Sequence, residues 1–147
     1  MTPPEDPAAP DHIGLNLVRA AEAWEKDFNA RMVAAGHTVF ADARSRVIRY
    51  IGWAGIDQAR LAGLSGMTKQ AVNVHLDGLE AAGLVARVAS PSDARQKRVV
   101  FTEAGLAMLA DADRIKGEVE ADYVRRIGSK PFADLRNALR ALVADHQ

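Results

Sequence analysis

The chain has 147 residues, 48% of them hydrophobic, with 19 basic and 19 acidic side chains and no cysteine. This length and apolar content predict one domain with its own core, and the absence of cysteine excludes a disulfide or a thiol redox switch. Because there is no run of about 18 apolar residues and no basic-then-apolar leader, we expect a cytoplasmic protein without a membrane partner.

The N-terminal part of the chain predicts a tail followed by two helices. Residues 1–10 hold four of the six prolines and predict a disordered tail. Residues 11–35 have apolar side chains at helical spacing, and Gly36 would end that helix. A second helix is expected over residues 38–51. Residues 52–56 then predict a short extended link that could supply a third strand to a small sheet.

Two closely spaced helices are predicted next. Asp57 can cap a short helix, which a glycine-rich break at residues 63–66 would end. Thr68 can cap a second helix with apolar residues on one face, and Gly83 suits the position after its last turn, where a positive φ is required. The pattern of helix, tight turn and helix is typical of a helix-turn-helix.

A β-hairpin is predicted directly after these helices. Residues 84–89 and 98–101 are rich in β-forming side chains, and the sequence Ser90-Pro91-Ser92-Asp93 between them is typical of a turn. The fold class expected is therefore mainly α with a small β wing. Residues 38–102 would form a winged helix-turn-helix lobe.

Exposed groups of this lobe suit contact with double-stranded DNA. A helix of about 14 residues is roughly 21 Å long and fits the major groove. Residues 41–102 carry nine basic and five acidic side chains, a net charge of +4, which leaves −4 on the rest of the neutral chain. A winged helix that serves only as a protein-interaction module is the alternative. Such a module needs neither a basic wing nor exposed hydrogen-bonding groups on its second helix. The expected DNA-binding residues are Thr68, Lys69, Gln70, Asn73, Val74, Asp93, Arg95 and Lys97.

The segments that flank the winged lobe predict a homodimer. A long helix is expected from Thr102 to about Ile127, and a final helix after a break at residues 128–129. Residues 11–36 and 103–147 carry apolar stripes but have little chain of their own to pack on, so a second subunit is the expected partner. Packing on the winged lobe of the same chain is the alternative.

At its middle third the chain resembles the MarR family of bacterial winged-helix transcriptional regulators. The resemblance implies one domain over residues 11–147 and a homodimeric repressor on an inverted-repeat operator. It also implies that Arg95 enters the minor groove while Asp93 steadies the wing. The chain differs at Ala94 and Val74, where the family often has arginine. The matching segments are Thr68-Lys69-Gln70-Ala71-Val72, Leu79-Glu80-x-x-Gly83-Leu84-Val85-x-Arg87, Asp93-x-Arg95-x-Lys97-x-Val99 and Phe101-Thr102-x-x-Gly105.

The same resemblance implies release from DNA by a small aromatic or anionic effector, bound between the winged lobe and the dimer helices. Enzyme chemistry has no support, because Ser65 lacks the glycine pattern of a nucleophile elbow. The four histidines show no metal-ligand spacing, so neither a metal nor another cofactor is expected. Candidate effector-pocket residues, each of which also suits a core position, are Trp24, Phe28, Phe40, Arg44, Ile48 and Trp53.

Overall fold

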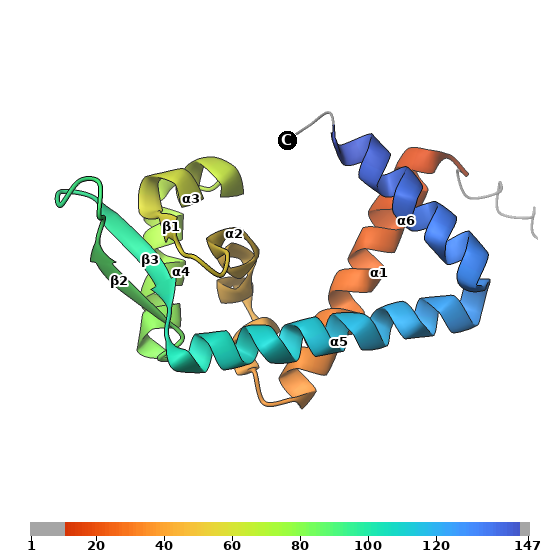
Figure 1. Ribbon diagram of the computed structural model, residues 1–147, viewed down its shortest axis with the longest axis horizontal. Helices are drawn as coiled ribbons and strands as arrows, with labels where there is room; N and C mark the ends of the chain where they lie inside the picture. The colour runs from red at the N-terminus through yellow and green to blue at the C-terminus, as the bar shows by residue number, and fades with distance from the viewer. Residues whose placement is uncertain (1–10, 145–147) are drawn as a thin grey trace, which may run out of the picture.

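A long helix joins the two ends of the molecule in the computed structural model, which describes residues 11–144 (Figure 1). This helix, α5 (Glu103–Ile127), runs from the winged lobe to the end where α1 (Ile13–Ala34) and α6 (Ser129–Ala144) lie. The predicted tail, residues 1–10, lies outside the described part of the chain. Within residues 11–144, no helix is long and apolar enough to cross a membrane.

The predicted helix over residues 38–51 is wrong in its continuity. Two 3₁₀ segments, η1 (Thr38–Ala41) and η2 (Ala43–Val47), precede a single α-helical turn, α2 (Ile48–Ile51). Asp42 separates η1 from η2 with an extended backbone, and its carboxylate accepts a 2.9 Å hydrogen bond from the Arg44 N–H. The chain therefore restarts at a capping residue instead of continuing as one helix.

The helix-turn-helix is formed by α3 (Gln58–Ser65) and α4 (Lys69–Ala81), as predicted. Thr68 caps α4, since its hydroxyl oxygen accepts a 3.1 Å hydrogen bond from the Ala71 N–H. Gly83 follows α4 with φ +76°, and the two backbone bonds of a Schellman motif close the helix there. Asp57 was expected to cap α3, but its side chain makes no capping bond.

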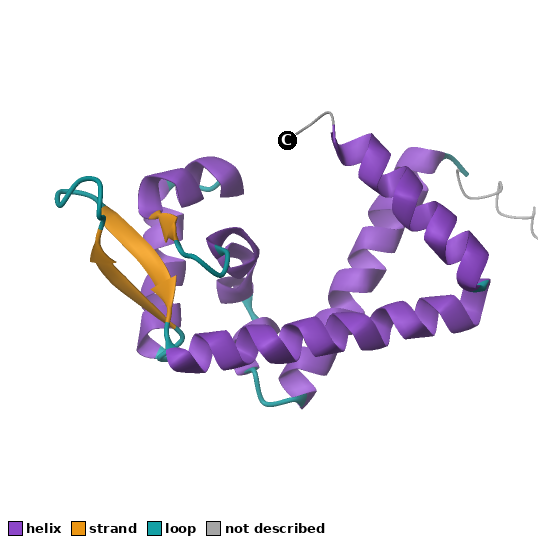
Figure 2. Ribbon diagram, in the orientation of Figure 1, coloured by secondary structure: helices purple, strands orange, loops and turns teal. Residues whose placement is uncertain are grey.

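A three-stranded antiparallel sheet completes the winged lobe (Figure 2). Its strands are β1 (Ile56–Asp57), β2 (Val85–Ala89) and β3 (Lys97–Phe101), in the spatial order β1-β3-β2. β1 confirms the third strand expected at the end of the link, with Ile56 opposite Val99. The pairing of β1 with β3 fixes where α3 begins relative to the wing.

One apolar core joins the winged lobe to α1 and α5. From α3 and α4 it takes the fully buried side chains of Leu61, Val72 and Leu76. Not every large apolar side chain of α5 faces this core, since Leu106 is 38% exposed. The residues that α5 buries are Gly105, Met108, Ala112, Ile115 and Val119.

Candidate nucleic-acid interface and adjoining pocket

The outer face of α4 presents all five of its predicted DNA-binding positions to solvent. Val72, between them in sequence, is fully buried, which sets the rotation of α4 about its axis. Val74 is 66% exposed, an unusual position for an apolar side chain on a helix whose other large apolar residues face the core. The exposed positions are Thr68, Lys69, Gln70, Asn73 and Val74.

The wing tip presents an exposed cation. The side chain of Arg95 is 92% exposed, and its Nε lies 3.3 Å from the carboxylate of Asp93. Asp93 also accepts a 3.0 Å hydrogen bond from the Arg95 N–H, which holds the turn. Asp93 thus shapes the loop, while the guanidinium of Arg95 extends beyond it.

The basic side chains that follow have different environments. Lys97 is exposed at the start of β3, as a phosphate contact requires. Arg98 points the other way: its side chain is 27% exposed and bonds to the carbonyl oxygens of Ala54 at 2.9 Å and Gly55 at 3.2 Å. Its charge also pairs with Asp57 at 3.4 Å. The guanidinium of Arg98 therefore holds the lobe together and does not extend toward a duplex.

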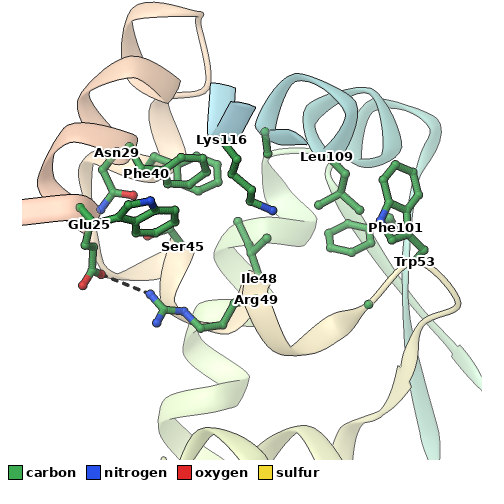
Figure 3. A pocket seen from close by; sticks show the side chains of 14 residues that line it. Glu25, Asn29, Phe40, Ser45, Ile48, Arg49, Trp53, Phe101, Leu109 and Lys116 are labelled. Carbon is green, nitrogen blue, oxygen red and sulfur yellow. Dashed lines mark hydrogen bonds and ion pairs between the residues drawn. The ribbon is translucent and has the colours of Figure 1, made fainter. Parts of the chain in front are cut away.

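An apolar pocket of about 220 Å³ lies between α1, the η2–α2 segment, α5 and the end of β3 (Figure 3). Three aromatic rings form one wall, with Trp24 stacked on Phe28 at a centroid distance of 5.0 Å. Phe40 meets the edge of Phe28 at 5.6 Å. Trp53, on the loop after α2, lies near Phe101 on the opposite side. The volume of the pocket suits a molecule with one aromatic ring.

Five of the six predicted pocket residues line this space: Trp24, Phe28, Phe40, Ile48 and Trp53. Arg44 is the exception, because its guanidinium is paired with Asp42 at 2.7 Å and its aliphatic part packs over Gly78. The hydrogen bond from Arg44 lowers the pKa of Asp42 from its ordinary value of 3.8 to about 2. Arg44 therefore links η2 to α4 outside the pocket.

Two basic residues that the sequence analysis missed line the pocket instead. Lys116 extends from α5 over the space between the aromatic wall and Leu109, and its ammonium lies 3.3 Å from Asp113 (Figure 3). Arg49 lies on the other side, 3.3 Å from Glu25. Spacing could have found Lys116, since it follows the lining residue Leu109 by seven positions, or two helical turns.

Within residues 11–144, no group of three or more His, Asp or Glu side chains is arranged to hold a metal ion. His37 illustrates the reason, because its ring nitrogen lies 2.7 Å from Asp111 on α5 as an isolated pair. The hydrogen bond with His37 lowers the pKa of Asp111. The pair joins the segment after α1 to α5.

The chain is similar in sequence and in structure to known transcriptional regulators. The sequence model described as the MarR family matches residues 41–96, which hold η2 to the wing turn. The HTH-type transcriptional repressor Rv2887 of Mycobacterium tuberculosis is 32% identical over 91 residues, or 62% of this chain. The chain spans 66% of the length of that relative.

Two solved structures extend the likeness over nearly the whole chain. The transcriptional repressor CouR bound to a 23-mer DNA duplex is 28% identical, with a TM-score of 0.68 and coverage of 91% of both chains. The complex of Mycobacterium tuberculosis Rv2887 with salicylic acid is 26% identical, also with a TM-score of 0.68. Its match covers 92% of this chain and 98% of that one.

Proposed function

This chain belongs to the MarR family, and we propose that it is a sequence-specific, double-stranded DNA-binding transcriptional repressor. In this proposal it acts as a homodimer on an inverted-repeat operator and releases the operator when a small aromatic anion binds. The observation that carries the proposal is the pairing of an exposed polar face on α4 with an exposed cation at the wing tip.

The chemistry of both elements supports contact with a duplex. Lys69 and Gln70, in the first turn of α4, are exposed and can bond to base edges or phosphates in the major groove. Arg95 can enter an adjacent groove, because a single contact with Asp93 leaves most of its guanidinium donors free to bond DNA. The likeness to CouR, whose structure holds a DNA duplex, supports the same assignment.

The exposed apolar faces of the terminal helices support the homodimer. On α1, Ile13 is 73% exposed and Val18 is 53% exposed, although both are large apolar side chains. On α6, Leu139 and Leu142 are also exposed, on the same face of the helix. A second copy of the chain would cover these surfaces and place two winged lobes about a two-fold axis.

The pocket supports an anionic, single-ring effector. The aromatic wall of Trp24 and Phe28 would stack on a ring, and the ammonium of Lys116 would pair with a carboxylate at the pocket mouth. The pocket is bounded both by α1 and α5 and by the winged lobe. A ligand there would bias how the lobe sits on the long helix, and the likeness to the salicylic acid complex supports this ligand class.

Selection of duplexes from a random pool, followed by footprinting, tests the proposal. The full chain should enrich an inverted repeat with half-site centres roughly 10 base pairs apart, and binding should weaken steeply between about 50 and 200 mM salt. Salicylate should release the selected duplex, and Lys116→Met should weaken that release without changing DNA affinity. Failure to enrich any duplex at low salt would overturn the proposed DNA binding.

A further inference from the structure

An amide pair joins the two helices of the helix-turn-helix at their outer edge. Gln58 is the first residue of α3, and its Nε2 donates a hydrogen bond to the Oδ1 of Asn73, in the second turn of α4. Both side chains border a groove of about 190 Å³ between the helices, together with Lys69. The pair therefore lies within the face that would approach DNA.

The backbones that carry this pair are rigidly placed. Leu61 of α3 and Val72 of α4 are completely buried, one turn and one residue away from the two amides. Gln58 also directly follows β1, whose residues Ile56 and Asp57 pair with β3. Neither helix can rotate without breaking the core, so the hydrogen bond sets the orientation of the Asn73 side chain and not the position of the helices.

The direction of this hydrogen bond has a chemical consequence. An asparagine amide has an oxygen that only accepts and a nitrogen that carries two donors. Because the oxygen of Asn73 faces Gln58, its nitrogen is left for another partner. The bidentate contact with adenine that an asparagine often makes needs both the oxygen and the nitrogen to face the base.

We propose that Gln58 is a positioning residue that turns Asn73 into a hydrogen-bond donor toward DNA. Asn73 then selects a base whose major-groove edge presents acceptors and no donor, namely guanine or thymine, and discriminates against cytosine, which presents only a donor. This inference rests on the proposed function, since it names the base chemistry read by the same α4 face.

The decisive variant reverses the hydrogen bond. In Gln58→Glu the carboxylate can only accept, so the Asn73 nitrogen turns toward it and the Asn73 oxygen faces the duplex. Gln58→Met keeps the side-chain length and removes the bond altogether. Asn137→Ala is the control, because Asn137 is an exposed amide on α6, outside the winged lobe.

The experiment measures base preference by competition among duplexes that differ at one position. Asn73→Ala first identifies the position, as the one where preference among the four bases is lost. There the parent chain should prefer guanine or thymine over cytosine by about tenfold. Gln58→Glu should shift the preference to cytosine or adenine, Gln58→Met should flatten it, and Asn137→Ala should leave it unchanged. Thermal melting confirms that each variant is folded. If Gln58→Glu does not fold, the base preference of Gln58→Met tests the role of Gln58.

Each result has a definite meaning. A parent chain that prefers cytosine or adenine at that position, or a folded Gln58→Glu or Gln58→Met variant that keeps the parent preference, would overturn the role of Gln58. The same holds if Asn73→Ala changes no base preference, although the parent still selects an operator. If the parent selects no duplex, the proposed function fails, and this inference fails with it.

Discussion

The guanidinium of Arg98 donates a 2.9 Å hydrogen bond to the carbonyl oxygen of Ala54, and so ties the middle strand of the sheet to the loop before β1. Gly55, next in that loop, approaches β3 so closely that a Cβ would lie 2.6 Å from the Val99 carbonyl oxygen. The same loop carries Trp53 at the edge of the pocket. One short segment therefore forms part of the pocket wall and part of the wing's support.

We expect Arg98→Met to lower the free energy of unfolding by about 1–3 kcal/mol, because it leaves two loop carbonyls and Asp57 without their charged donor. Urea unfolding followed by circular dichroism measures the loss. Lys97→Met is the matched control: this exposed neighbour on β3 should keep its stability and lose DNA affinity instead. Equal stability of the Arg98 variant and the parent would contradict the structural role of Arg98.

Local sequence signals predicted the helices and strands around the site. The features that could not be predicted depend on contacts between residues far apart in the sequence. Thr68 and Gly83 act within a few residues of themselves, so the bounds of α4 could be predicted. Asp57 looks like a cap in sequence, but Arg98, 41 residues later, takes its carboxylate. Only the folded chain could reveal that contact.

In the candidate site too, local contacts could be predicted from the sequence, whereas the direction of a side chain on an irregular segment could not. Arg95 and Asp93 are neighbours in a turn, and the hydrogen bond from the Arg95 N–H to Asp93 forms within that turn. Arg44 was expected in the pocket, but the 3₁₀ geometry of η2 directs its side chain toward Asp42 and α4 instead. A helix assumed to be regular misplaces such a side chain.

Gly105 and Gly117 make a matched pair on α5. A Cβ at Gly105 would lie 2.1 Å from the Leu84 carbonyl oxygen and 2.9 Å from the Phe101 ring, whereas a Cβ at Gly117 meets nothing within 4 Å. We expect Gly105→Ala to cost at least about 2 kcal/mol of unfolding free energy. Gly117→Ala should gain about 0.5–1 kcal/mol from helix propensity. Thermal and urea unfolding of both variants would test this, and a stable Gly105→Ala protein would contradict the close approach of α5 to Leu84.

The carboxylate of Asp42 should titrate with a pKa of about 2, first because of its side-chain hydrogen bond with Arg44 and next because of the Arg44 N–H. A carboxylate whose pKa is lower in the folded state stabilises the fold above about pH 4, and this contribution is lost as the pH falls toward 2. Arg44→Met should raise the pKa of Asp42 and flatten that pH dependence. Carbon-detected NMR titration measures the pKa, with Arg46→Met as the control on the same segment. An unchanged Asp42 pKa in Arg44→Met would contradict this prediction.

Arg95→Ala should weaken DNA binding by about 1–3 kcal/mol, because the variant loses a cation that extends into solvent at the wing tip. Its melting temperature should match that of the parent, since a 92% exposed side chain contributes little to folding. Fluorescence anisotropy with the selected operator measures the affinity at several salt concentrations. Unchanged affinity would remove the wing tip from the interface.

The exposed apolar face of α6 should hold the homodimer together. Leu139 and Leu142 lie on one face of this helix, and Asn137 lies on the opposite face. The double change Leu139→Asp and Leu142→Asp places charges in the proposed interface, and it should produce a folded monomer of 15.8 kDa in light scattering. Asn137→Asp adds charge away from the interface and should leave the parent dimer, of twice that mass, intact. The monomer should protect one half-site of the operator and bind far more weakly, because it loses the second winged lobe. A parent chain that is itself a monomer while it protects a full inverted repeat would contradict the role assigned to α6.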